Sequence, residues 1–206
     1  MDSQNRLLEI FGHFPGIGPR QAKRFVHYLM ARPPAFIKEF TELVADVKKM
    51  TAECARCRCF FIQKSVKTEI CPTCADTSRD AAALLVVARD SDFETIEKSG
   101  AYRGMYFILG GTVPVLDKEP ENRIRLVKLL ERVRDESALR EIILSLDTTP
   151  DGEHTADIVK QAVMKLTEST SNKPLKISIL GRGLSTGAEL EYMDGETIRN
   201  ALENRH

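Results

Sequence analysis

The sequence contains no tryptophan, and only 6% of its 206 residues are aromatic. An excess of charge of either sign is also missing, because 30 Lys and Arg residues balance 30 Asp and Glu residues. Any binding of nucleic acid therefore has to depend on a local basic patch and not on the field of the whole molecule. The hydrophobic fraction of 42% is typical of a folded globular protein and excludes intrinsic disorder.

Long apolar runs, internal repeats and low-complexity tracts are absent as well. No apolar run approaches the roughly 20 residues that are needed to cross a bilayer. Residues 1–6 lack the charged and then apolar layout of a signal peptide. We therefore expect a cytoplasmic protein without a membrane partner, built from one domain or two small ones.

Apolar periodicity divides the chain into a helical part and an α/β part. Between residues 5 and 50 the apolar residues recur at helical spacing, with breaks at 14–19 and 32–34, which predicts three short helices. Later apolar runs of strand length alternate with helical patterns, which predicts βα units on a mainly parallel sheet. The predicted strands are 84–88, 105–109, 142–146 and 177–180, and the predicted helices are 92–99, 122–134, 155–168 and 195–203.

A glycine-rich turn at residues 14–19 joins the first two predicted helices. Gly16 and Gly18 allow a tight turn and a close approach to another surface, and Pro19 suits the first turn of a helix. Backbone N–H groups at a helix start donate to a phosphate, and basic side chains four residues apart lie beside them on one helical face. The alternative is an ordinary turn beside a solvated basic helix. The predicted DNA contacts are Gly16, Gly18, Arg20, Lys23 and Arg24.

Four of the five cysteines form two CxxC pairs that are separated by thirteen residues. Four paired thiolates without a histidine match a closed, structural zinc site. An iron site of the rubredoxin type and two disulfides are the alternatives, and a reducing compartment disfavours the disulfides. The predicted ligands are Cys54, Cys57, Cys71 and Cys74. Cys59 is left as a buried small side chain, a spare ligand or an exposed thiol.

Acidic residues follow the first and third predicted strands of the α/β part. Asp90 and Asp92 follow the first strand, and Asp147, Asp151 and Glu153 follow the third. The carboxyl ends of parallel strands meet at one edge of a sheet, so these carboxylates could gather there around Mg²⁺. That arrangement would suit a phosphoryl-transfer enzyme acting on DNA.

The order of these parts resembles the RecR family of bacterial recombination mediators over essentially the whole chain. Residues 14–24 resemble the helix-hairpin-helix motif of DNA repair proteins, and the stretch 181–192 resembles the closing segment of the family. The fold class that follows is α/β, with a helix-hairpin-helix region, a four-cysteine zinc finger, a Toprim-like domain and a C-terminal strand-helix segment. The expected boundaries are 1–51, 52–78, 79–170 and 171–206.

The resemblance implies a non-enzymatic, DNA-binding protein that acts with RecO, and in many bacteria RecF, to help load RecA on DNA coated with single-strand-binding protein. It also implies a homodimer or a ring-like homotetramer, with the C-terminal segment in the subunit contacts, located at the nucleoid. Ala88 stands where Toprim enzymes have a Glu, so catalysis and a Mg²⁺ cofactor are not expected. The remaining acids, Asp147, Asp151 and Glu153, are interpreted as a docking surface for a basic partner such as RecO. A Mg²⁺-dependent Toprim enzyme and a zinc-containing interaction module are the alternative functions.

Overall fold

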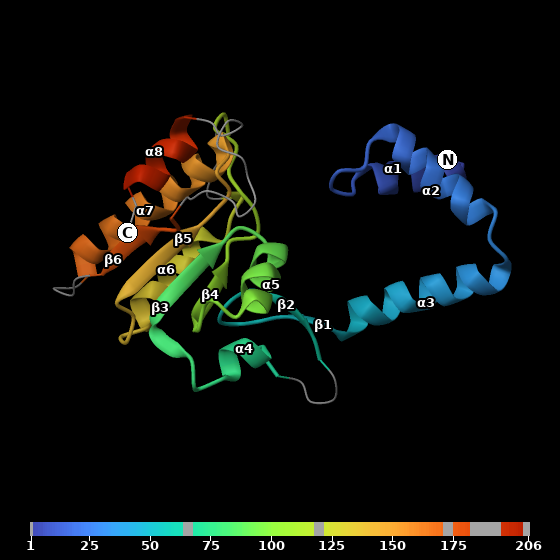
Figure 1. The fold of residues 1–206 in the computed structure, drawn as a ribbon. Helices are drawn as coiled ribbons and strands as arrows, with labels where there is room; N and C mark the ends of the chain where they lie inside the picture. Colours follow the sequence, from blue (N-terminus) through green and yellow to red (C-terminus); the bar gives the residue numbers. More distant parts are fainter. Residues whose placement is uncertain (1, 64–67, 118–121, 171–174, 182–194, 204–206) are drawn as a thin grey trace. The chain divides into compact units, whose positions relative to one another are not determined.

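The computed structural model describes residues 2–63, 68–117, 122–170, 175–181 and 195–203 (Figure 1). The chain divides into two compact units. The helical unit comprises Met1–Thr51 and Ile62–Ser65, and the α/β unit comprises Ala52–Phe61 and Val66–His206. No helix among the described residues combines the length and the apolar character needed to span a membrane.

The helical unit contains the three helices that the sequence predicts: α1 (Ser3–Gly12), α2 (Pro19–Met30) and α3 (Pro34–Met50). The Asp2 carboxylate caps the start of α1 by accepting a hydrogen bond from the Gln4 N–H. The Phe11 ring lies between α1 and α2, with its centroid 5.5 Å from that of Phe14 and 5.6 Å from that of Phe25. These edge contacts hold α1 and α2 together as a hairpin.

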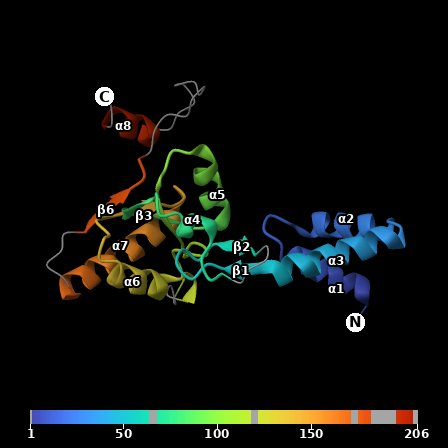
Figure 2. The same ribbon diagram turned by 90° about the horizontal axis from the view of Figure 1, so that it is seen from below.

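A parallel four-stranded sheet forms the centre of the α/β unit, with the strand order β4-β3-β5-β6 (Figures 1 and 2). The four predicted strands and the helices that alternate with them are confirmed. Their bounds are β3 (Asp80–Val87), α5 (Asp90–Ser99), β4 (Gly104–Ile108), α6 (Leu126–Asp135), β5 (Glu141–Ser145), α7 (Pro150–Thr170), β6 (Lys176–Ile179) and α8 (Gly195–Glu203).

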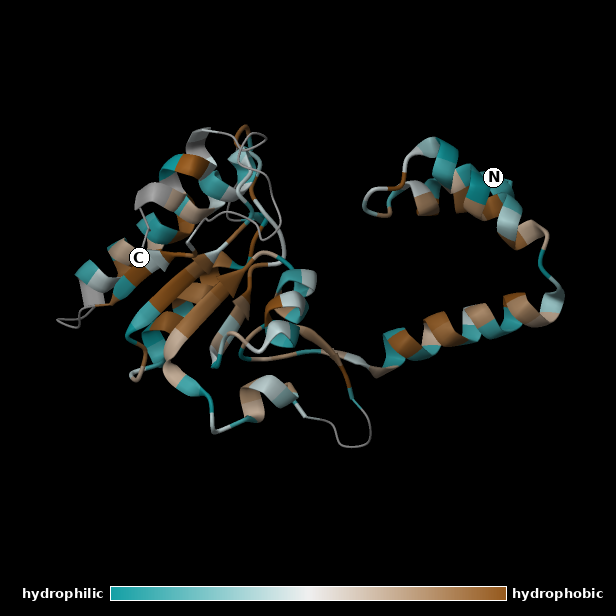
Figure 3. Cartoon of the chain, in the orientation of Figure 1, coloured by the Kyte–Doolittle hydropathy of each residue, from teal (hydrophilic) through white to brown (hydrophobic). Residues whose placement is uncertain are grey.

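The sheet is buried on both faces, which explains its continuous apolar strands (Figure 3). Leu84 and Val86 belong to the core cluster that includes residues of α6 and α7. Leu85 and Val87 alternate with them and belong to a second cluster, together with side chains of α5 and all five cysteines. The sheet thus separates a helical layer from a layer that contains the cysteine segment.

The cysteine segment contains the short strands β1 (Thr51–Glu53) and β2 (Phe60–Ile62) and the one-turn helix α4 (Pro72–Ala75). We predicted residues 52–78 as a domain of their own, whereas their cysteines are buried in the same core cluster as strands β3 and β4. The Cys57 carbonyl accepts a hydrogen bond of 2.8 Å from the Ile108 N–H of β4, which is an edge strand. The segment therefore covers part of a sheet edge that would otherwise be exposed.

Two boundaries that we predicted from the sequence differ from those in the structure. Helix α7 begins at Pro150 and not near residue 155, because the Thr149 hydroxyl accepts a hydrogen bond from the Gly152 N–H in the manner of an N-cap. Strand β6 lies beyond the boundary that we set at residue 170, yet it pairs with β5 in the same sheet. Residues 182–194, which hold most of the 181–192 stretch that resembles the closing segment of the family, lie outside the described residues.

Candidate metal centre and nucleic-acid interface

The two CxxC pairs meet on one side of the sheet. The first pair lies in the turn between β1 and β2, and the second pair brackets the start of α4. The Sγ atoms of Cys57 and Cys71 are 3.5 Å apart. Backbone N–H groups point at two of the sulfurs: Cys71 N donates to Cys54 Sγ at 3.3 Å, and Cys74 N donates to Cys71 Sγ at 3.4 Å. Such N–H groups stabilise thiolates.

The geometry of the four sulfurs fits a tetrahedral metal ion. The Sγ atoms of Cys54, Cys57, Cys71 and Cys74 all lie within 4.8 Å of one another. Zinc bonded to sulfur at about 2.3 Å would place four tetrahedral sulfurs about 3.8 Å apart. All four side chains are buried, so no coordination position is open to solvent. Among the described residues, this is the only group of three or more His, Cys, Asp or Glu side chains placed to share an ion.

Hydrogen bonds among the thiols shift their pKa values in opposite directions. Hydrogen bonding from Cys57, followed by smaller contributions from the other thiols, holds the pKa of Cys54 far below its usual value. The reciprocal hydrogen bond to Cys54 raises the pKa of Cys57. The pKa of Cys71 is lowered as well, whereas that of Cys74 is raised, so the cluster favours the thiolate form at Cys54 and Cys71 and the thiol form at Cys57 and Cys74. A metal ion would replace the remaining protons.

Cys59 is a buried side chain with an exposed fraction of 2%, and it does not belong to the group of four. Its carbonyl accepts a 2.8 Å hydrogen bond from the Cys54 N–H, which closes the turn of the first CxxC pair. Of the three roles left open by the sequence, the buried position excludes an exposed thiol.

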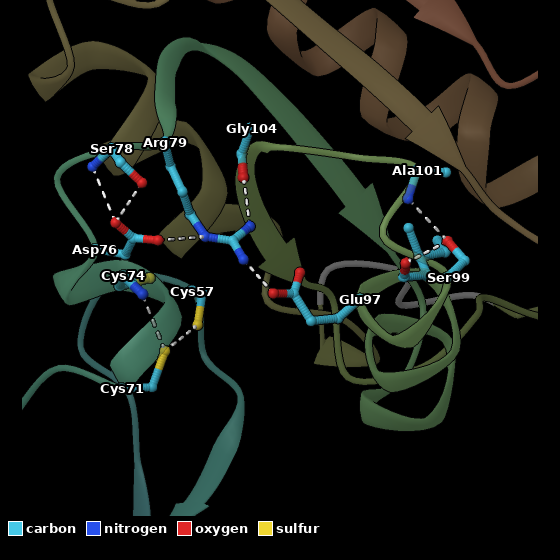
Figure 4. Close-up of polar contacts among 11 residues, drawn as sticks. Cys57, Cys71, Cys74, Asp76, Ser78, Arg79, Glu97, Ser99, Ala101 and Gly104 are labelled. Atoms are coloured by element: carbon cyan, nitrogen blue, oxygen red, sulfur yellow. Dashed lines mark hydrogen bonds and ion pairs between the residues drawn. The ribbon is translucent and has the colours of Figure 1, made fainter.

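Arg79 connects the cysteine segment to the sheet and to α5 (Figure 4). Its guanidinium donates to the Gly104 carbonyl of β4 at 3.2 Å, forms an ion pair with Glu97 of α5 and lies 3.7 Å from the Asp76 carboxylate, which follows α4. Hydrogen bonds from the Ser78 hydroxyl and backbone N–H lower the pKa of Asp76. Arg79 thus holds the end of the cysteine segment in place.

Arg132 of α6 makes a second connection between the cysteine segment and the rest of the α/β unit. Its buried side chain donates to the carbonyls of Arg56 and Tyr106, at 3.0 Å and 2.6 Å, and pairs with Glu136 at 3.0 Å. Arg56 donates to the same Glu136 oxygen at 2.7 Å. Sequence reasoning missed Arg79 and Arg132, because an arginine surrounded by other charged residues carries no local signal that its side chain is buried.

The hairpin turn has the conformation that its glycines permit. Gly16 adopts a left-handed backbone with φ of 74°, and a side chain there would be strained. Gly18 is the N-cap of α2 and makes no side-chain capping bond, and Pro19 occupies the first helical position. Pro19 has no N–H, and the N–H groups of Gln21 and Ala22 donate to the Gly18 carbonyl at 3.0 Å. In the first turn of α2 this leaves the Arg20 N–H to face an anion, beside the positive end of the helix dipole.

The basic residues that follow the turn lie on an exposed surface of α2. Arg20, Lys23 and Arg24 are all exposed. The Arg24 guanidinium donates a 3.4 Å hydrogen bond to the Gln21 side chain. No Asp or Glu occurs in the sequence between Glu9 and Glu39, so α2 carries positive charge without acidic neighbours along the chain. Phosphates can approach this face of α2.

The acidic residues at the carboxyl ends of the strands are engaged with the protein itself. Asp147 pairs with Arg89 at 3.0 Å, and Asp90 accepts a 2.8 Å hydrogen bond from the Phe60 N–H. Asp151 lies in the first turn of α7 and accepts a 3.1 Å hydrogen bond from the Val115 N–H. Ala88 is fully buried after β3, so the position where Toprim enzymes have a Glu offers no titratable group.

Comparison with known proteins places these features in one family. Residues 82–180 match the family model of the Toprim domain, and residues 183–206 match the model described as RecR, C-terminal. The chain is 34% identical to the Recombination protein RecR of Chloroflexus aggregans, over 97% of this chain and 91% of that relative. It is also 34% identical to the protein of the same name from Bifidobacterium adolescentis, over 97% of this chain and 94% of the relative.

A third relative, from Dehalococcoides mccartyi, has the same name and is 33% identical over 98% of this chain. The similarity therefore extends through the hairpin, the cysteine pairs and the Toprim domain. The chain belongs to the RecR family of recombination proteins.

Proposed function

We propose that the chain is a non-enzymatic mediator of recombinational repair that binds DNA without sequence preference and acts with RecO, and with RecF where present, to help load RecA on DNA coated with single-strand-binding protein. The proposal rests on the exposed basic surface of α2, which follows the Gly16–Gly18 turn and has no acidic residue near it along the chain. Phosphate contacts from Arg20, Lys23 and Arg24 position a protein on DNA without reading its bases.

The test is an anisotropy titration of a gapped DNA duplex at several salt concentrations. The double variant Arg20→Ala/Arg24→Ala should weaken binding to all sequences alike and flatten the salt dependence, since each phosphate contact contributes about 0.9 to the slope. The matched control, Lys160→Ala/Lys165→Ala, removes two exposed positive charges from α7. Equal loss in both double variants, or a loss confined to one DNA sequence, would contradict the proposal.

Incubation of the same DNA with Mg²⁺ tests the absence of catalysis. The buried Ala88 removes the Glu that a Toprim enzyme would use as a general acid or base, and we expect the DNA to remain intact. Cleaved or rejoined DNA would favour the enzymatic alternative.

Zinc is the ion that we propose for the four-cysteine centre. Four buried thiolates with tetrahedral spacing match a closed, structural zinc site. Cys54, Cys57, Cys71 and Cys74 would hold the ion, whose binding free energy would stabilise the cysteine segment. Measured metal content of the purified protein tests this, and one equivalent of iron in place of zinc would contradict it.

The acidic surface around the start of α7 is proposed as the docking site for RecO. Asp147, Glu153 and Asp157 line a cavity of about 220 Å³, together with the apolar side chains of Leu146 and Ile179. A basic segment with an apolar anchor would fit this lining. The charge-reversed variant Glu153→Lys/Asp157→Lys should weaken RecO binding in calorimetry and leave DNA binding by the chain alone unchanged.

We propose that the chain forms a homodimer or ring-like homotetramer and that helix α3 contributes to the subunit contacts. Helix α3 exposes a row of apolar side chains at helical spacing, including Leu43 at 57% and Val47 at 53% exposure. A second copy could bury this row. Sedimentation of Leu43→Asp/Val47→Asp should show a smaller assembly than the unmodified chain, and an unchanged assembly would place the contact elsewhere.

A further inference from the structure

The basic row on α2 ends in an exposed aromatic ring. Arg20, Arg24 and Tyr28 are spaced by four residues, so their side chains follow one another along one face of the helix. Eight residues of helix correspond to about 12 Å, which is close to the rise of three or four nucleotides in one strand of duplex DNA. Tyr28 has an exposed fraction of 49%, so about half of its surface is available to a partner.

A guanidinium group is stacked on this ring. The Cζ atom of Arg32 lies 3.9 Å from the centroid of the Tyr28 ring. The Phe36 ring meets Tyr28 edge-on, with centroids 6.2 Å apart and planes at 80°. Arg32 follows the end of α2 and Phe36 belongs to the first turns of α3, so the corner between the two helices holds a cluster of flat side chains. Exposed aromatic rings and guanidinium groups are surfaces on which nucleic-acid bases stack.

The surroundings of Tyr28 favour an anionic partner. Arg24 precedes Tyr28 by one turn, Arg32 covers one face of the ring, and the nearest acidic residues along the chain are Glu9 and Glu39. A purely apolar partner would gain nothing from this charge, whereas a nucleotide brings both a phosphate for the cations and a flat base for the ring.

We propose that Tyr28 and Arg32 form a stacking platform for an unpaired base of the DNA strand whose phosphates lie along Arg20 and Arg24. This inference rests on the proposed DNA binding and adds the kind of DNA: a single strand, or the single-stranded part of a gap. An unpaired base is required because the faces of paired bases inside a duplex are already covered by their neighbours.

The absence of tryptophan provides a direct probe of this platform. Tyr28→Trp gives the chain a single indole at the proposed stacking position, and its fluorescence should be quenched when single-stranded oligothymidine or a gapped duplex is added. A blunt duplex of equal length should quench much less. Met30→Trp is the matched control, because Met30 is exposed two residues further along α2 and therefore faces away from Tyr28. Its fluorescence should not change with single-stranded DNA.

Affinity measurements on the same probes give a second, independent readout. Tyr28→Ala should weaken binding to oligothymidine about tenfold, and its effect on the blunt duplex should be less than about twofold. Tyr28→Phe keeps the ring and should bind as the unmodified chain does. Arg32→Lys keeps the charge but loses the flat group, and it should weaken binding to the single strand more than to the duplex.

The outcomes separate this inference from the proposed function. If oligothymidine binding depends on Arg20 and Arg24 but the indole of Tyr28→Trp is not quenched, the platform is wrong and the phosphate contacts stand. Equal losses on single strand and duplex in Tyr28→Ala would likewise overturn the platform. If the unmodified chain binds none of the probes, both the proposed function and the platform fail.

Discussion

The two units of the chain use their large side chains in opposite ways. In the α/β unit the rings of Tyr106 and Phe107 and the strand residues around them are completely buried. In the helical unit only Ala22 and Val26 are buried among the described residues, while many larger apolar side chains are exposed. The α/β unit therefore buries its large apolar side chains in a core, whereas the helical unit exposes most of its own to solvent.

This difference indicates where a substitution should act. Polar residues of the α/β unit, such as Arg79 and Arg132, connect elements to one another, and their loss should reduce stability. Basic and aromatic residues of α2 contact solvent, and their loss should reduce binding while the fold persists. Within the α/β unit we expect the largest loss of stability where a metal ligand is removed, and smaller losses where a buried or exposed ion pair is removed.

Cys71→Ser should remove the metal and unfold the cysteine segment. Cys71 is buried, its Sγ lies 3.5 Å from that of Cys57, and it receives the Cys74 N–H, so the variant loses one ligand and a centre of the local hydrogen bonding. Loss of a structural metal should reduce the free energy of unfolding by about 5 kcal/mol or more. Metal content and thermal unfolding followed by circular dichroism measure both effects.

The control for this variant is Cys59→Ser, which changes a neighbouring cysteine that is equally buried but lies outside the group of four. It should keep one equivalent of metal. Loss of the metal in Cys59→Ser, or its retention in Cys71→Ser, would show that the ligand set is different.

Arg132→Met should destabilise the α/β unit by about 2–4 kcal/mol. The substitution keeps much of the side-chain volume but leaves the carbonyls of Arg56 and Tyr106 without this donor inside the protein. Arg134→Met on the same helix is the control, because Arg134 is exposed and its loss should cost less than about 0.5 kcal/mol. Chemical denaturation compares the stabilities of the two variants. Equal midpoints would mean that the buried Arg132 contributes no more to stability than the exposed Arg134 does.

The sequence predicts the backbone of this protein better than its side-chain contacts. Apolar periodicity located the strands of the sheet, and the paired CxxC spacing located the four sulfurs that meet, because both signals are local. The connection of Arg79 to Glu97 depends on residues eighteen positions apart that only the folded sheet brings together. The start of α7 was missed for a different reason: the Thr149 hydroxyl caps a first turn that contains few apolar residues.

Arg58→Gly should stabilise the cysteine segment by about 1 kcal/mol. Arg58 has a left-handed backbone with φ of 67°, which glycine adopts without the clash of a Cβ atom. Arg58→Ala removes the same side chain but keeps the Cβ, and it should bring no gain. Thermal unfolding of the metal-loaded protein separates the two variants. A gain in Arg58→Ala equal to that in Arg58→Gly would assign the effect to the side chain and not to the backbone.

Glu141 should give the smallest effect, and one that depends on pH. Hydrogen bonds from Lys176, at 2.9 Å, and from Ser178, at 2.7 Å, hold the pKa of Glu141 below its usual value and connect β5 to β6. Because the pKa is lower in the folded state, this contribution is present above the unfolded pKa of about 4.3 and is lost as the pH falls through the folded pKa.

Glu141→Gln should therefore cost less than about 1 kcal/mol at pH 7, since Lys176 is largely exposed, and the difference from the unmodified chain should shrink toward pH 3. Urea denaturation at both pH values measures it. A difference that stays constant with pH would show that the carboxylate acts through packing and not through its charge. Glu141 connects β5 to β6 inside the α/β unit. Even a difference that does not change with pH would therefore be a loss of fold stability, which is the effect expected for a residue of this unit.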